Sequence, residues 1–145
     1  MSTHLKDKEE KIREILERLI QESAKGIPVV VEGKKDIEAL RLLGVEGEMI
    51  PVKASGKSLL YAVSKLENSD KGEVILMLDF DRRGKELTAK LKRHLEGSPI
   101  ATNTTFWGEI FGLIGKDVKN VEGLATYMET LRRKSERSSS LADAW

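Results

Sequence analysis

The sequence predicts an α/β fold in which a mostly parallel sheet of about four strands is flanked by helices. Short apolar runs without polar alternation are typical of strands buried on both faces, as in parallel sheets. Between these runs, apolar residues recur at helical spacing, so that each strand can reach a parallel neighbour through a helix. A chain of 145 residues is long enough for one such core.

The first half of the chain contains two expected strands, each followed by a helix. Residues 1–25 are expected to form an amphipathic helix packed on the domain, because isoleucines and leucines form one stripe at helical spacing. A buried strand over 27–32 precedes a helix over 35–43. The next strand, over 48–52, contains a proline and is therefore expected at a sheet edge. A helix follows over 55–66.

The second half of the chain is expected to complete the sheet and then to add helices. The central strand covers 73–79, a helix continues to about His94, and a fourth strand lies near 100–102. Residues 105–134 are expected to form a helical extension of the same domain, because apolar residues again recur at helical spacing. Residues 135–145 are rich in serine and are expected to form a disordered tail.

Composition excludes several classes of function. The formal net charge is +1, so no overall basic field requires a nucleic-acid partner. The absence of cysteine excludes disulfides, zinc–thiolate sites and cysteine nucleophiles. No apolar run reaches the roughly 20 residues that a membrane span needs, and the N-terminus has no apolar signal segment. We therefore expect a cytoplasmic protein without membrane association.

Three acidic residues follow two of the buried strands. Asp79 and Asp81 follow the apolar run that begins at Val74, and Glu32 follows Val29–Val31, with a glycine at the turn in both cases. Ligands of parallel sheets bind beyond the carboxyl ends of the strands, so the three carboxylates converge if these strands are neighbours. Close carboxylates repel each other unless a proton or a cation lies between them, and Mg²⁺ prefers oxygen ligands.

These two motifs, in this order and with a strand and a helix between them, resemble the Toprim domain. This Rossmann-like α/β domain is shared by topoisomerases, bacterial-type primases, ribonuclease M5 maturases and OLD-family nucleases. The resemblance covers residues 26–104. The run Val-Val-Val-Glu-Gly-Lys-Lys-Asp, which ends at Asp36, is similar to the M5 and small stand-alone forms, and residues 78–84 fit the second motif. Residues 117–124 resemble the C-terminal part of small archaeal Toprim proteins.

The resemblance implies a magnesium site, with Mn²⁺ as the alternative ion. In the family the aspartates hold Mg²⁺ against a phosphate, and the glutamate acts as general acid or base or as a further ligand. Carried over, Glu32, Asp79 and Asp81 would be both catalytic residues and metal ligands. Asp36 is either a fourth ligand or a first-turn helix charge. Arg83 stands where topoisomerases have a third acid, which puts a second metal in doubt.

Basic residues cluster beside the acids. We expect them to contact phosphate, the alternative being that they only offset the acidic pocket. They are Lys34, Lys35, Lys57, Arg82, Arg83 and Lys85, with Lys53 in the neighbouring loop. Phe106, Trp107 and Phe111 repeat at helical spacing, which favours packing in the core over stacking on a base.

The expected function is Mg²⁺-dependent processing of nucleic acid, with RNA rather than DNA as the partner. The resemblance implies phosphodiester hydrolysis in the manner of ribonuclease M5. The alternative is a non-catalytic module that binds nucleic acid or a nucleotide as a subunit of a larger complex. A homodimer is a further candidate assembly.

Overall fold

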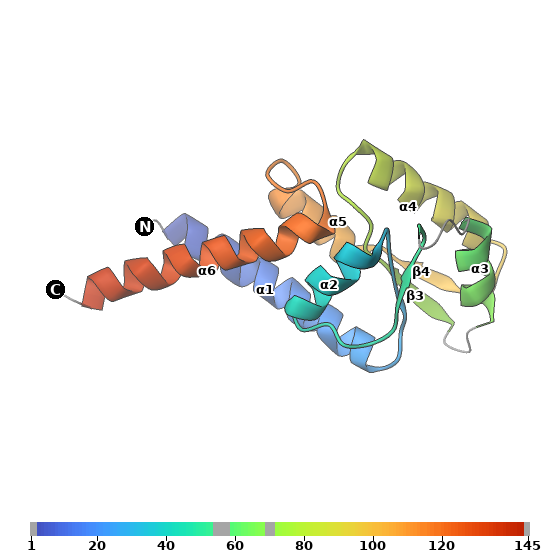
Figure 1. Cartoon of the computed structure of the whole chain (residues 1–145), viewed down its shortest axis with the longest axis horizontal. Coiled ribbons are helices and arrows are strands. Elements are labelled where there is room, and N and C mark those ends of the chain that lie inside the picture. The colour runs from blue at the N-terminus through green and yellow to red at the C-terminus, as the bar shows by residue number, and fades with distance from the viewer. Residues whose placement is uncertain (1–2, 54–58, 69–71, 144–145) are drawn as a thin grey trace.

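The computed structural model describes residues 3–53, 59–68 and 72–143, and its elements follow the order that the sequence predicts (Figure 1). The opening of the helix expected from residue 55 lies outside the described residues. The strands are β1 (Val29–Val31), β2 (Met49–Pro51), β3 (Glu73–Leu76) and β4 (Ala101–Asn103). The helices are α1 (Thr3–Ala24), α2 (Lys34–Leu42), α3 (Leu59–Glu67), α4 (Arg82–Leu95), α5 (Thr105–Ile114) and α6 (Val121–Asp143).

The four strands form one sheet in the order β2-β1-β3-β4, and every neighbouring pair is parallel. The predicted α/β class is therefore confirmed. β2, which ends at Pro51, lies at an edge of the sheet, as its proline predicts. β1 and β3 are direct neighbours, with Val30 opposite Leu76. Their carboxyl ends therefore lie side by side, which is the condition for Glu32 and Asp79 to meet.

Both faces of the sheet are buried, because side chains alternate between two apolar clusters along each strand. Val29 and Val31 belong to the cluster that contains the apolar residues of α1, α5 and α6, whereas Val30 belongs to the cluster that contains those of α3 and α4. α2 contributes Leu40 to the first cluster. The helices thus form a layer on each side of the sheet, and Figure 1 shows α3 and α4 gathered apart from α1, α2 and α6.

β3 ends earlier than the sequence predicts, and this changes the placement of the aspartates. The strand was expected to extend through Asp79, but it ends at Leu76. Regular alternation would put Phe80 with Leu78, yet Phe80 packs in the same cluster as Met77. The backbone therefore departs from strand geometry between Leu78 and Phe80. Strand periodicity alone does not make Asp79 and Asp81 point the same way.

α6 is longer than the helix expected to end near residue 134, since it continues to Asp143 through most of the segment expected to be disordered. A helix that is already nucleated adds residues at little cost, and serine lowers helix propensity only slightly. Figure 1 shows α6 and α1 extending together away from the sheet. No helix among the described residues is long and apolar enough to cross a membrane.

Candidate functional site

Three of the predicted acids lie together at the carboxyl ends of β1 and β3. Glu32 directly follows β1 and Asp36 lies in the first turn of α2, and each is only 7% exposed. Asp79 follows the end of β3 and is partly buried. The Glu32 carboxylate lies within hydrogen-bonding reach of Asp79, and its charge acts on both Asp79 and Asp36. The predicted convergence of Glu32, Asp79 and Asp81 therefore holds for Glu32 and Asp79 and not for Asp81, while Asp36 acts on Asp79 from the start of α2.

Burial and mutual repulsion raise the pKa of two acids in this cluster, Asp79 and Asp36. Burial is the main cause that raises the pKa of Asp79 to about 7, and the charge of Glu32 adds to it. The backbone N–H of Val121 donates to Asp79 Oδ1 at 3.2 Å and opposes the rise. The pKa of Asp36 is raised too, first by burial and then by Glu32 and Glu122, against a hydrogen bond from Gly33 N–H. A proton or a cation would relieve this repulsion.

One carboxylate oxygen of Glu32 is left without a partner. Lys53 Nζ lies 3.1 Å from Glu32 Oε2, so the lysine that the sequence placed in the neighbouring loop forms an ion pair with this acid. Glu32 Oε1 is buried and has no hydrogen-bond partner among the described residues. Buried polar atoms are nearly always paired, so an orphaned acceptor of this kind indicates a site built for a donor or a cation.

Asp81 stands apart from the other three acids. Its side chain is exposed, and its Oδ1 accepts a hydrogen bond from Gly84 N at 2.8 Å, which caps α4. No hydrogen bond joins Asp81 to Glu32 or Asp79 in the described part of the chain, and Oδ2 is not used by the cap. The buried Phe80 separates the two aspartates along the chain.

Gly84 is required here for a close approach and not for a turn. It lies inside α4, and a Cβ at this position would overlap the carbonyl group of Asp79. Only a glycine allows the first turn of α4 to lie this close to the backbone of Asp79. Gly33, the glycine of the other motif, has an extended backbone with φ −150°, and a Cβ there would meet nothing within 4 Å.

The donor chemistry of the cluster fits a hard cation such as Mg²⁺. As the side chains stand, no group of three or more histidine, cysteine, aspartate or glutamate residues within the described ranges is gathered closely enough to hold an ion. The acids nevertheless offer only oxygen donors, and Glu32 Oε1 is a buried acceptor with nothing to accept from. Glu32 and Asp79 would hold such an ion, and Asp81 would add the oxygen that does not cap α4.

The C-terminal extension fixes the loop that follows β3, which sequence reasoning missed. Trp107 Nε1 donates to the carbonyl oxygen of Leu78 at 2.9 Å, and Phe80 N donates to the carbonyl oxygen of Lys119 at 2.8 Å. Trp107 also stacks on Phe111, with ring centroids 5.5 Å apart and planes 9° apart. These aromatic side chains therefore pack against the fold, as their helical spacing predicts.

The predicted basic residues that the structure describes lie in the first turns of α2 and α4, next to the acids in the chain, and not all of them are unpaired. Lys34, Lys35 and Arg83 are exposed and form no ion pair with any described residue. Arg82 pairs with Glu86 at 3.1 Å, and Lys85 Nζ lies 4.3 Å from the centre of the Phe111 ring. Lys57 lies outside the described residues.

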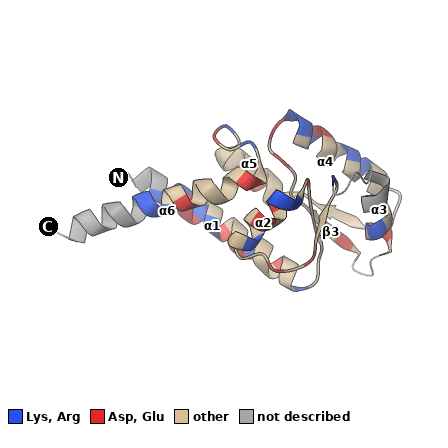
Figure 2. Cartoon of the chain, viewed as in Figure 1, with Lys and Arg blue, Asp and Glu red and all other residues tan. Residues whose placement is uncertain are grey.

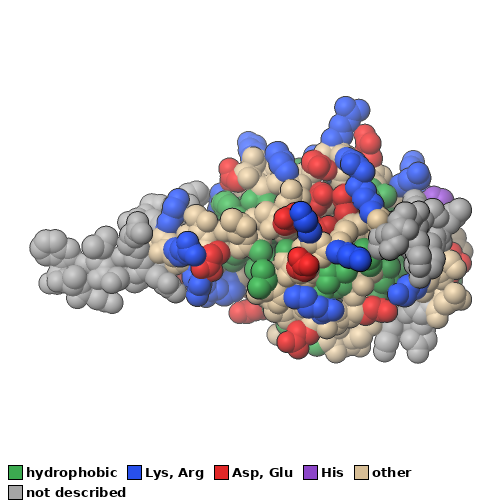
Figure 3. Space-filling view, viewed as in Figure 1, with side chains coloured by type: hydrophobic (Ala, Val, Ile, Leu, Met, Phe, Trp, Pro, Cys, Tyr) green, Lys and Arg blue, Asp and Glu red, His purple; other side chains and the backbone are tan. Residues whose placement is uncertain are grey.

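A groove of about 1000 Å³ opens beside Asp81, between α1, the start of α4 and the loop after α5. Its basic lining residues are Lys8, Arg82, Lys85, Lys116 and Lys119, and its acidic ones are Asp81, Glu86 and Asp117. Figure 2 shows basic positions on α4 and on the loop after α5, and Figure 3 shows basic side chains projecting along that edge of the molecule. Sequence reasoning did not include Lys116 and Lys119.

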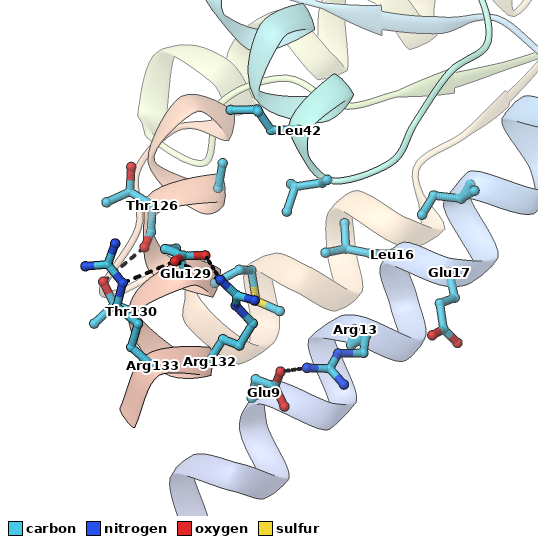
Figure 4. Close-up of a pocket in the computed structure, with 14 residues that line it drawn as sticks. Glu9, Arg13, Leu16, Glu17, Leu42, Thr126, Glu129, Thr130, Arg132 and Arg133 are labelled. Atoms are coloured by element: carbon cyan, nitrogen blue, oxygen red, sulfur yellow. Dashed lines mark hydrogen bonds and ion pairs between the residues drawn. The ribbon is translucent and has the colours of Figure 1, made fainter. Parts of the chain in front are cut away.

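A second groove lies between α1, the C-terminal end of α2 and α6, away from the predicted acids (Figure 4). Arg13 pairs with Glu9 across one turn of α1, and Glu129 pairs with Arg133 on α6. Leu42, at its upper edge in Figure 4, is 82% exposed. α2 begins at the acid cluster and ends at this groove, so the two sites lie at opposite ends of that helix.

A parallel sheet with carboxylates at the ends of adjacent strands defines an α/β protein with a candidate cation site. The Toprim domain family matches residues 28–110 of this chain. A UPF0292 protein of Methanocaldococcus jannaschii is 37% identical over 120 residues, which cover 82% of this chain and 91% of that protein. A UPF0292 protein of Methanosarcina barkeri is 32% identical over 126 residues, which cover 87% of this chain and 86% of that protein.

A solved structure described as a putative protein from Aquifex aeolicus is similar in fold, with a TM-score of 0.63 and 25% sequence identity. The alignment with this structure covers 76% of the present chain and 94% of the other chain. The chain therefore belongs to the Toprim family, and the resemblance to small archaeal Toprim proteins is confirmed. Membership supports a function related to nucleic acid, and Toprim domains generally bind Mg²⁺.

Proposed function

We propose that the chain is a Mg²⁺-dependent protein that hydrolyses phosphodiester bonds in nucleic acid, with RNA as the substrate. The observation that carries this proposal is Glu32 Oε1, a buried acceptor without a partner beside Asp79, whose pKa is raised to about 7. Strongly perturbed acids in close proximity are typical of functional sites. The preference for RNA rests on the resemblance of the Glu32–Asp36 motif to that of ribonuclease M5.

In this proposal Glu32, Asp79 and Asp81 hold the ion, and Asp36 is the candidate fourth ligand. Mg²⁺ supplies neutralisation of the charge that develops on the phosphate during hydrolysis. Asp36 also has a structural contact, because its Oδ2 accepts the N–H of Gly33 at 3.0 Å and so fixes the start of α2.

Glu32 is the proposed proton acceptor. The ammonium of Lys53 lies 3.1 Å from Oε2, and this ion pair holds the side chain in one orientation. Oε1 then remains as a buried, unpaired acceptor. This oxygen can either bind the ion or take a proton from an attacking water as a phosphodiester bond is hydrolysed, so Glu32 is a metal ligand or the general base of the proposed reaction.

The basic residues around the acids are the proposed contacts to phosphate. Lys34, Lys35 and Arg83 are exposed and unpaired with any described acid, and the groove beside Asp81 adds further lysines. In a chain with a net charge of only +1, this concentration favours a polyanionic partner at one place on the surface.

The test is cleavage of a structured RNA in Mg²⁺ by the full chain and by two variants, Glu32→Gln and Asp81→Asn. Glu32→Gln is expected to lose at least about 100-fold in rate, which is the usual effect of removing a general base. Asp81→Asn is expected to lose a similar factor, because it removes a proposed ligand of the ion that neutralises charge on the phosphate. Glu38→Gln is the matched control, because Glu38 lies on the exposed face of α2 and carries the same charge. Equal cleavage by Glu32→Gln and Glu38→Gln would contradict the proposal.

The same experiment separates an enzyme from a binding module. If the wild-type chain binds the RNA but does not cleave it in either Mg²⁺ or Mn²⁺, the chain holds nucleic acid without processing it. Cleavage of DNA in preference to RNA would overturn the choice of substrate and leave the site intact.

A further inference from the structure

The start of α6 is joined to the acid cluster. The backbone N–H of Val121 donates to Asp79 Oδ1 at 3.2 Å, and the carbonyl oxygen of Lys119 accepts from Phe80 N at 2.8 Å. Two hydrogen bonds thus hold the start of α6 and the residues just before it against the loop that follows β3. The residue that follows Val121 is therefore fixed close to Asp79.

That residue is Glu122, whose side chain is exposed and forms no hydrogen bond or ion pair with another described residue. Its charge is close enough to Asp36 to help raise the pKa of that acid. The first turn of α6 is held by Asn120, whose Oδ1 accepts from Gly123 N at 2.6 Å. Glu122 is therefore an unpaired acid in the first turn of a helix whose first residue, Val121, is hydrogen-bonded to Asp79.

The orphaned oxygen of Glu32 is an independent sign that the cluster is built for a ligand. Glu32 is more than nine-tenths buried, and its Oε1 has no partner while its carboxylate lies against Asp79. Glu122 would be a fourth carboxylate beside Glu32, Asp36 and Asp79 if its side chain turned toward an ion, since as the side chains stand no three such acids among the described residues are gathered closely enough to hold one. Among the described residues, only Lys53 is ion-paired with any of the four. A group of acids with one such counter-charge still carries excess negative charge and is suited to a divalent cation.

We propose that Glu122 is a further carboxylate ligand of the cation site, brought to Asp36 and Asp79 by the start of α6. This inference rests on the proposed function, because the ion is the one proposed for Glu32, Asp79 and Asp81. It makes the C-terminal extension part of the site and not merely a support for the sheet.

A helix-stabilising role is the competing explanation, because an acidic residue in the first turn interacts favourably with the helix dipole. That role would lower the melting temperature of a Glu122→Gln variant and leave its affinity for a divalent ion unchanged. The two explanations therefore differ in a quantity that does not depend on catalysis.

The test is a calorimetric titration of the full chain with Mn²⁺, comparing wild type, Glu122→Gln and Glu38→Gln. We expect Glu122→Gln to raise the dissociation constant about tenfold or more, as loss of groups that support a metal site does. Glu38→Gln, which removes the same charge from the exposed face of α2, is expected to stay within about twofold of wild type, as for a screened surface charge.

The titration distinguishes an error in the role of Glu122 from an error in the proposed function. Equal dissociation constants for Glu122→Gln and Glu38→Gln, with wild type binding Mn²⁺, would overturn the role of Glu122 and leave the proposed function standing. Wild type that does not bind Mn²⁺ at all would overturn both. Because Glu122 is exposed, the variant is expected to fold, and thermal unfolding of the metal-free protein checks this.

Discussion

Replacing Asp79 by asparagine is expected to stabilise the metal-free protein. The pKa of Asp79 is about 7 in the fold against 3.8 when free, so its ionised form is disfavoured by the folded state. The group therefore contributes stability below pH 4 that is lost as the pH rises through 7. Asparagine has no charge to lose and can still accept the N–H of Val121 through its Oδ1.

The size of the effect follows from the shift in pKa. A difference of about three units corresponds to about 4 kcal/mol if it is fully transmitted to stability. Asp79 is only partly buried, so solvent screening reduces the expected gain to about 1–2 kcal/mol at pH 8. For a domain of this size, that gain raises the melting temperature by roughly 3–6 °C.

The assay is thermal unfolding with a chelator at pH 4, 6 and 8. The wild-type and Asp79→Asn curves should coincide near pH 4 and separate as the pH rises. Asp117→Asn is the control, because Asp117 is exposed and lies 3.8 Å from Lys8 in a surface pair that should contribute less than about 1 kcal/mol. An Asp79→Asn protein less stable than wild type at pH 8 would refute the reasoning, since the Asp79 charge would then be stabilising.

Three other substitutions test how the site is held. Gly84→Ala should lose about 1–3 kcal/mol of unfolding free energy in urea denaturation, because the new Cβ would overlap the carbonyl of Asp79. Gly97→Ala is the control and should stay near wild type, because a Cβ at Gly97 would meet nothing within 4 Å. Trp107→Phe keeps an aromatic ring but leaves a backbone carbonyl without its donor, so urea denaturation should show a loss of about 1 kcal/mol. Lys53→Met should lower the metal-free melting temperature, because it leaves the buried Glu32 carboxylate without its counter-charge, and an unchanged value would contradict that ion pair.

The sheet and the meeting of Glu32 with Asp79 could be predicted from sequence because they depend on local pattern. An apolar run followed by an acid specifies a buried strand and the end at which the acid lies, and the strand order supplied the rest. The placement of Asp81 could not be predicted this way, because it depends on where β3 stops being extended. That point is set by the packing of Phe80 and by the close approach of Gly84 to Asp79.

The position of the C-terminal extension beside the site could not be predicted from the sequence either. Glu122 lies 43 positions after Asp79 in the printed numbering, and nothing in a single sequence indicates that α6 begins against β3. The one available signal was local: Asn120 is a favoured helix N-cap, and the acid two positions later falls in the first helical turn. This pattern predicts a helix start but does not identify what lies beside it.

The most direct test of the cation site is a crystal of the full chain soaked in Mn²⁺ and measured for anomalous scattering. We predict one anomalous peak within coordination distance of carboxylate oxygens of Glu32 and Asp79, with Asp81 turned to contribute Oδ2. A crystal with no peak there, or with its only peak in the groove between α1 and α6, would contradict it.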